Sequence, residues 1–270
     1  MTGTGGELLV LWDIDYTLVN SGGLGADLYQ VVFSQMFGRP LPELAPMAGR
    51  TDRAIILATL ARASVPRPEE HVDAFIALLG KHAAASGDVA RARARALPGA
   101  ANALAALSAR AALDATARPG GVRQSVLTGN IRPLAEAKLG AAGLLAHLDL
   151  DAGAYGDAHE VRAELVGLAR QRARAAYGSA FDGAATVLVG DTPLDVAAAL
   201  TAGARAVAVA TGAYPAADLA AAGAHAVLPD LTDTCLLLSA VHDGGQLPVC
   251  VISGVRPSAA CGPSRPRQQR

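Results

Sequence analysis

Short apolar runs alternate with helical patterns along most of this chain. Residues 7–12 form an apolar run that ends at Asp13, which is typical of a strand buried on both faces of a parallel sheet. We predict further strands at 122–127, 186–189, 206–209 and 226–228. We predict helices at 100–110, 133–142, 161–177, 193–202 and 233–241. Strands that alternate with helices favour an α/β fold with a parallel sheet.

Residues 20–95 lack this alternation. Apolar positions recur there at three-to-four spacing, as in Val72, Phe75, Ile76 and Leu79, and this spacing indicates amphipathic helices. Prolines divide the segment into separate helices. We therefore predict an all-helical module over 20–95.

The composition narrows the possible classes of protein. Of the 270 residues, 51% are hydrophobic and 17% charged, which is enough apolar material for a buried core. The net charge of −1 removes the electrostatic argument for binding nucleic acid or an anionic membrane. No apolar run approaches the roughly 20 residues that span a bilayer. Residues 243–270 are rich in Gly, Pro, Ser, Arg and Gln and predict a disordered tail.

The cysteines and the N-terminus bear on the compartment. Cys235, Cys250 and Cys261 lie near the C-terminus without a CxxC pattern, which argues against a disulfide scaffold or a zinc site. The N-terminal residues lack the basic stretch and the small-residue cleavage site of a secretion signal. We therefore expect a cytoplasmic protein.

Polar residues follow three of the predicted strands. Asp13 and Asp15 follow the first strand, Thr128 follows the second, and Asp191 follows the third, with Asp195 four residues further on. In open α/β sheets, ligands bind outside the carboxyl ends of the strands. Four carboxylates gathered there would repel one another without a cation, and all-oxygen ligation suits Mg²⁺. The sequence therefore predicts a Mg²⁺ site at this edge.

The spacing of Asp13 and Asp15 suits phosphoryl transfer. One carboxylate can attack phosphorus, and a carboxyl group two residues on can protonate the leaving oxygen and later deprotonate water. The Thr128 hydroxyl and the Gly129 and Asn130 amides offer donors for a phosphate at a loop-to-helix junction. Singly, each residue could instead end a strand or cap a helix. Their joint occurrence in this order favours a site.

Three segments together resemble motifs of the haloacid dehalogenase superfamily, in its phosphoglycolate-phosphatase-like branch. Residues 13–18, 127–130 and 190–195 are similar to the first, second and fourth motifs of that family. The resemblance covers about residues 7–240. The phosphoglycolate-phosphatase-like branch carries an inserted helical cap where this chain has residues 20–95. The resemblance thus implies a Rossmann-like, doubly wound core formed by residues 1–19 and 96–242, with a helical cap over 20–95.

The resemblance implies a role for each matching residue. Asp13 would be the nucleophile, Asp15 the general acid and base, and Thr128 a phosphate ligand. Mg²⁺ would be held by Asp13, the backbone carbonyl of Asp15, and Asp191, with Asp195 in support. The second aspartate also favours phosphatases over the dehalogenases of the superfamily, which lack it.

The third motif of the family is normally a lysine that pairs with the nucleophile and the phosphate. Lys138 lies in the helix after Thr128, which is early for that role. Arg162 lies at the start of the helix that leads to the fourth motif, where the lysine usually sits, and its forked guanidinium suits phosphate. We favour Arg162 and keep Lys138 as the alternative, although either could be a surface cation.

The cap should select the substrate. Arg50 precedes a predicted helix and could reach a substrate carboxylate or phosphate, while Thr51 and Asp52 could cap that helix. The sequence thus predicts a Mg²⁺-dependent phosphatase of a small phosphomonoester, namely a phosphoglycolate-like compound, a sugar phosphate or a nucleotide. The alternatives are a phosphomutase of the same fold and a non-catalytic binding protein that kept the fold. We expect a monomer or homodimer that binds no nucleic acid and no membrane.

Overall fold

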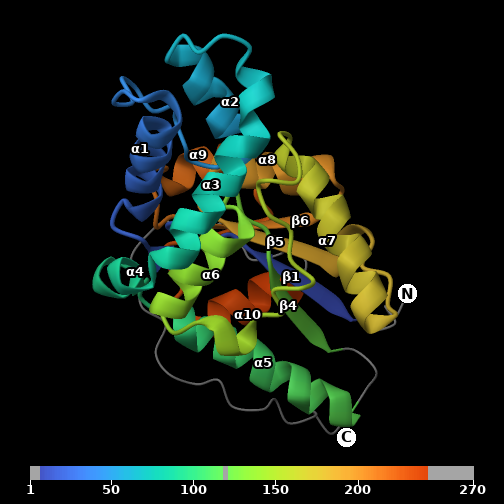
Figure 1. The fold of residues 1–270 in the computed structure, drawn as a ribbon. Helices are drawn as coiled ribbons and strands as arrows, with labels where there is room; N and C mark the ends of the chain where they lie inside the picture. The colour runs from blue at the N-terminus through green and yellow to red at the C-terminus, as the bar shows by residue number, and fades with distance from the viewer. Residues whose placement is uncertain (1–6, 118–120, 243–270) are drawn as a thin grey trace, which may run out of the picture.

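A five-stranded parallel sheet forms the centre of the molecule in the computed structural model, which describes residues 7–117 and 121–242 (Figure 1). The strand order is β4 (Val122–Val126), β1 (Leu8–Trp12), β5 (Thr186–Gly190), β6 (Arg205–Val209) and β7 (Ala226–Leu228). Every neighbouring pair is parallel. The predicted α/β fold is confirmed, while the predicted tail at 243–270 lies outside the described residues.

Helices cover both faces of the sheet. On one face lie α5 (Ala100–Ala117), α6 (Arg132–Ala141) and α10 (Thr234–His242), and on the other lie α7 (Arg162–Tyr177), α8 (Pro193–Thr201) and α9 (Ala216–Ala221). In β1, Val10 and Trp12 pack into the first layer, and Leu9 and Leu11 into the second. A strand without a solvent-facing side explains the apolar run before Asp13.

Four α-helices occupy residues 20–95. They are α1 (Leu24–Phe37), α2 (Asp52–Arg62), α3 (Val72–Ala85) and α4 (Gly87–Arg93). The short strands β2 (Val19–Asn20) and β3 (Arg95–Ala96) pair antiparallel where the chain enters and leaves this segment. The proposed division between cap and core falls at this pair, which the sequence did not predict because two residues show no periodicity.

The apolar centre of the cap extends into the core. Phe33 and Phe75 of the cap pack in one buried cluster with Ile131 and Leu134. Ile131 precedes α6 and Leu134 lies in it, so α6 packs against the cap as well as against the sheet. The cap therefore docks through a shared hydrophobic interface as well as through its two connecting strands.

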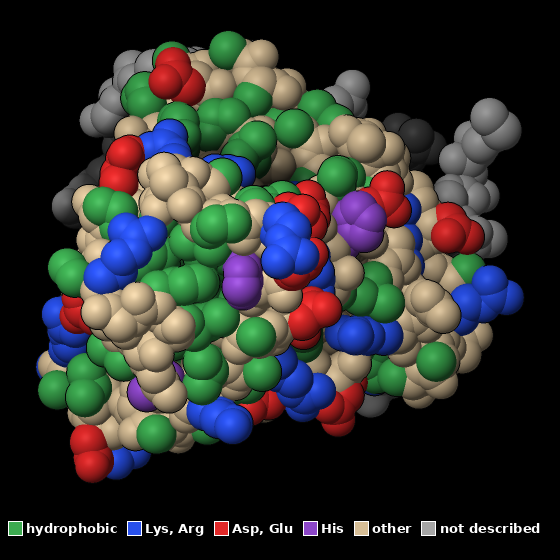
Figure 2. All heavy atoms as spheres, turned by 45° about the horizontal axis from the view of Figure 1, so that its top comes forward, with side chains coloured by type: hydrophobic (Ala, Val, Ile, Leu, Met, Phe, Trp, Pro, Cys, Tyr) green, Lys and Arg blue, Asp and Glu red, His purple; other side chains and the backbone are tan. Residues whose placement is uncertain are grey.

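The surface at the cap end carries charges of both signs. In Figure 2, which turns the top of Figure 1 forward, basic and acidic side chains lie intermixed around hydrophobic ones. Within residues 7–117 and 121–242, no helix has both the length and the apolar character needed to cross a membrane.

Candidate active site

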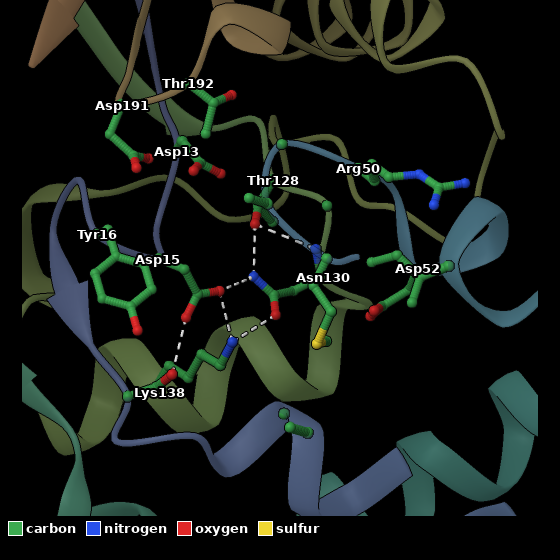
Figure 3. Close-up of a pocket in the computed structure, with 18 of the residues that line it drawn as sticks. Asp13, Asp15, Tyr16, Arg50, Asp52, Thr128, Asn130, Lys138, Asp191 and Thr192 are labelled. Carbon is green, nitrogen blue, oxygen red and sulfur yellow. Dashed lines mark hydrogen bonds and ion pairs between the residues drawn. The ribbon is translucent and has the colours of Figure 1, made fainter. Parts of the chain in front are cut away.

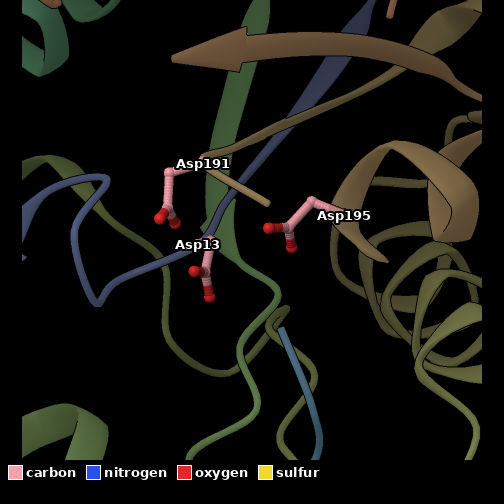
Figure 4. A group of neighbouring side chains, drawn as sticks. All are labelled: Asp13, Asp191 and Asp195. Atoms are coloured by element: carbon pink, nitrogen blue, oxygen red, sulfur yellow. The ribbon is translucent and has the colours of Figure 1, made fainter. Parts of the chain in front are cut away.

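Three carboxylates converge at the carboxyl edge of the sheet (Figure 4). Asp13 directly follows β1, Asp191 directly follows β5, and Asp195 lies in the first turn of α8. Because β1 and β5 are neighbouring parallel strands, both end at the same edge. The three side chains are buried, and each offers one oxygen within 4.8 Å of the others. We call these three residues the acidic cluster.

One guanidinium faces this cluster. Arg162, the first residue of α7, donates to Asp13 Oδ1 (2.8 Å), and its Nη2 lies 2.6 Å from Asp195 Oδ1. Burial raises the pKa of Asp13 to about 7, although Arg162 opposes the shift, and burial beside Asp13 raises the pKa of Asp191 to about 8. When its three carboxylates are ionised, the cluster carries more negative charge than the single guanidinium of Arg162 offsets.

The donor set of the cluster fits a hard divalent cation. All its ligand atoms are carboxylate oxygens, as Mg²⁺ prefers. A cation would stabilise the ionised carboxylates against the burial and the mutual repulsion that raise the pKa values of Asp13 and Asp191. Asp195 has the most partners within the protein. Its Oδ2 accepts hydrogen bonds from the hydroxyl and the backbone N–H of Thr192 in a capping box. Its contact with Arg162 occupies the other oxygen.

Asp15 belongs to a different environment (Figure 3). Its Oδ2 accepts from Lys138 Nζ (2.6 Å) and Asn130 Nδ2 (2.8 Å), and its Oδ1 accepts from Ser21 Oγ (2.9 Å). Lys138 also donates to Asn130 Oδ1 (2.7 Å). Burial alone would raise the pKa of Asp15, but the Lys138 charge and these hydrogen bonds lower it below its ordinary value. We call these four residues the Asp15 network.

The two cations weighed for one position therefore occupy two positions. Arg162 contacts Asp13, the predicted nucleophile, and Lys138 contacts Asp15. Both side chains are buried, so neither is a surface cation. Burial would lower the pKa of Arg162, but the Asp195 and Asp13 carboxylates raise it above its ordinary value.

The segment after β4 is organised by Thr128 and Asn130. The buried Thr128 hydroxyl accepts from the Asn130 backbone N–H (3.2 Å) and side-chain Nδ2 (2.7 Å). The sequence predicted a role for the Asn130 amide but not for its side chain, which joins Thr128 to Asp15 and Lys138. Nothing in the local sequence marks that link, because Lys138 and Asp15 are brought together only by the fold.

The cap closes the other side of a pocket of about 290 Å³. Met47 and Ile55 line it from the cap, opposite Asp13 and Asp15. Arg50 also lines the pocket, but its guanidinium points away from Thr128 (Figure 3) and donates to the carbonyls of Pro46 (3.4 Å) and Ala54 (3.3 Å). In this arrangement Arg50 holds its own loop together, and its contact with substrate stays a prediction.

Thr51 caps α2 as predicted. Its hydroxyl accepts from the Ala54 backbone N–H. Asp52 does not cap the helix with its side chain. Instead it is buried and accepts from the Tyr29 hydroxyl (2.6 Å) and the Ile131 backbone N–H (2.8 Å).

A family model for haloacid dehalogenase-like hydrolases matches residues 10–200. The chain belongs to this family, which confirms the resemblance drawn from the three motifs. A sequence comparison with curated proteins gives no match.

Solved structures of low sequence identity share the fold. A protein from Lactobacillus plantarum, provisionally named a phosphoglycolate phosphatase, has 16% identity and a TM-score of 0.59 over 86% of this chain and 99% of that one. CbbY from Rhodobacter sphaeroides, solved in complex with phosphate, has 19% identity and a TM-score of 0.57, covering 83% and 95%. A protein from Bacteroides vulgatus, provisionally named a beta-phosphoglucomutase, has 17% identity and a TM-score of 0.54, covering 88% and 92%. These similarities establish the fold. The reaction must be inferred from the residues of the site.

Proposed function

We propose that the protein is a Mg²⁺-dependent phosphatase that hydrolyses a small phosphomonoester through an aspartyl-phosphate on Asp13. The observation that carries this proposal is the separation of the two aspartates that follow β1. Asp13 faces Arg162 and the acidic residue Asp191, whereas Asp15 is held by Lys138. This separation, within one pocket, supports attack on phosphorus by one carboxylate and proton transfer by the other.

In the first step, an Asp13 oxygen attacks phosphorus, and the bond from phosphorus to the leaving oxygen breaks. Asp15 gives its proton to that oxygen. The incoming phosphate favours protonation of Asp15, because a nearby negative charge raises the pKa of a carboxyl group. Arg162 offsets charge on Asp13 and on the transferred phosphoryl group, while Thr128 and the amides that follow it orient the phosphate.

In the second step, water attacks the phosphorus of the aspartyl-phosphate, and the bond to Asp13 breaks. Asp15, now a carboxylate, takes the proton of that water. The low pKa of Asp15 in the Asp15 network favours this ionised form. Asp13, the backbone carbonyl of Asp15 and Asp191 would hold Mg²⁺, with Asp195 in support. The cation would supply charge neutralisation at the phosphate oxygens.

The test is phosphate release from a panel of phosphomonoesters, with Mg²⁺ and with EDTA. The panel contains phosphoglycolate, sugar phosphates, nucleotides and pyrophosphate. We expect metal-dependent release, and the preferred substrate will show what the cap pocket recognises. Release that is unaffected by EDTA contradicts the metal dependence, and a folded protein inert toward the whole panel contradicts the phosphatase assignment.

A phosphomutase of the same fold is the second candidate, supported by the fold shared with the Bacteroides vulgatus protein. The product distinguishes the two, since a mutase returns an isomerised sugar phosphate and a phosphatase returns free phosphate. A cytoplasmic location, a monomeric or dimeric state and a role for Arg50 in substrate binding belong to the same proposal.

A further inference from the structure

We propose that Asp52, a residue of the cap, is a positioning residue for the phosphate-binding segment of the core. Resting on the proposed function, this inference assigns to one cap side chain the task of holding Gly129 and Asn130 in the conformation that binds phosphate. Cap docking and phosphate binding would then be one linked event.

Asp52 makes two hydrogen bonds to the phosphate-binding segment. Its backbone N–H donates to the Gly129 carbonyl (2.7 Å), and its Oδ2 accepts from the Ile131 backbone N–H (2.8 Å). Asn130 lies between these two contacts. The N–H groups of Gly129 and Asn130 are the expected phosphate donors, and in this structure the Asn130 N–H donates to the Thr128 hydroxyl. In Figure 3, Asn130 lies between Asp15 and Asp52, so one segment is held by the core on one side and by the cap on the other.

The backbones approach one another too closely for ordinary side chains. A Cβ on Gly129 would lie 2.0 Å from the Arg50 carbonyl oxygen, and a Cβ on Gly156 would lie 1.7 Å from the Gly129 oxygen and 2.7 Å from the Asp52 nitrogen. Gly156 itself donates to the Asn130 carbonyl (2.9 Å) and accepts from Arg53 (2.9 Å). Cap, phosphate segment and the loop before α7 are therefore interlocked through their main chains.

Tyr29 fixes the Asp52 carboxylate from within the cap. Its hydroxyl donates to Asp52 Oδ1 (2.6 Å), and its ring packs 5.3 Å from that of Phe75 between centroids. Burial raises the pKa of Asp52 to about 6, against the opposing effect of the hydrogen bonds from Tyr29 and Ile131. The carboxylate is thus held by two uncharged donors, as suits a rigid tether.

The test compares Asp52→Ala and Tyr29→Phe with wild type, using inorganic phosphate as the probe. Its inhibition constant against turnover is measured with Mg²⁺, and its direct affinity by calorimetry. We expect Asp52→Ala to weaken phosphate binding by about tenfold or more and Tyr29→Phe by less, since a hydrogen bond to a charged group contributes more than 1.4 kcal/mol, the equivalent of tenfold. Asp52→Asn keeps an acceptor for Ile131 and should restore most of the affinity.

Thr59→Ala is the matched control. Thr59 is also a buried residue of α2 whose side chain accepts from a backbone N–H, that of Ala45 (3.2 Å). Among the described residues, its side chain makes no hydrogen bond to residues 128–131. We expect it to lower the melting temperature and leave phosphate affinity unchanged. An inhibition constant does not depend on how much of the enzyme is folded, so mere destabilisation leaves it unaltered.

Unchanged phosphate affinity in Asp52→Ala, with wild type binding and hydrolysing normally, overturns this inference alone. An equal loss in Thr59→Ala also overturns it, because any damage to the cap would then have the same effect. A wild-type protein that neither binds nor releases phosphate overturns the proposed function, and this inference with it.

Discussion

The acidic cluster and the Asp15 network share one pocket but have opposite charge balances. In the cluster, three carboxylates face one guanidinium, and the pKa values of Asp13 and Asp191 rise. In the network, a single carboxylate meets a single ammonium and two neutral donors, and the pKa of Asp15 falls. Two aspartates separated by one residue thus acquire opposite shifts from their surroundings.

In the proposed mechanism, this contrast separates two kinds of chemistry. A centre with excess negative charge attracts a cation, and the cation makes its carboxylate a suitable nucleophile toward an anionic phosphate. A centre whose charges balance does not need a bound cation, and its carboxyl group can gain or lose a proton when the substrate binds. The separation needs two cations on two helices, which Arg162 on α7 and Lys138 on α6 provide.

The strongest test removes the nucleophile. Asp13→Asn should lower turnover about 10⁴-fold or more, the scale seen when a covalent nucleophile is lost. Steady-state kinetics on the best substrate measures this loss, and circular dichroism verifies the fold. Activity that survives in a folded variant would move the nucleophile elsewhere.

The next test addresses the network. Asp15→Asn should reduce turnover by about 10²–10⁴-fold, since it removes general acid and base catalysis, while Mg²⁺ binding measured by calorimetry persists. Asp27→Asn, a change at an exposed carboxylate of α1, serves as the control. A rate equal to wild type in Asp15→Asn would rule out the proton-transfer role.

A third test compares the two cations directly. Arg162→Ala should cost about 10²–10³-fold in kcat, as for other lost groups that stabilise charge in the transition state. Lys138→Ala should cost less, because Asn130 and Ser21 still hold Asp15. If Lys138→Ala is the more damaging change, the assignment of the phosphate-pairing cation passes to Lys138.

The smallest expected effect concerns pH and metal. The folded-state pKa values of about 7 for Asp13 and about 8 for Asp191 lie above those of an unfolded chain, so the metal-free protein loses stability as pH rises between about 4 and 8. Metal binding requires deprotonated ligands. Mg²⁺ should therefore raise the melting temperature by a few degrees more at about pH 8.5 than at about pH 6. An equal shift at both values, or a shift retained in Asp191→Asn, would contradict the cluster as the metal site.

The sequence predicted the sheet and its carboxyl edge because both rest on local signals. Apolar runs mark the strands, and the residues that follow them must meet at one edge in a parallel sheet. The short helix α9 was not predicted, since six alanine-rich residues carry little periodicity. Strands β2 and β3 were not predicted for the same reason.

The connections among the site residues were less accessible to prediction. Lys138 and Asp15 are separated by 123 positions, and Asp52 and Ile131 by 79. No periodicity encodes such contacts, which depend on where α6 docks against the cap. From the sequence alone, Lys138 and Arg162 were therefore alternatives for one position, and Asp52 was predicted only as a helix cap.

The antiparallel pair of β2 and β3 has a consequence for how such proteins diversify. The chain crosses to the cap and returns at adjacent points, so recombination at these two junctions would exchange all four cap helices as a cassette. The recipient must still match the apolar side chains of Ile131 and Leu134. On the proposal that the cap selects the substrate, an exchanged cap would bring a new preference only where one side of α6 fits its apolar face.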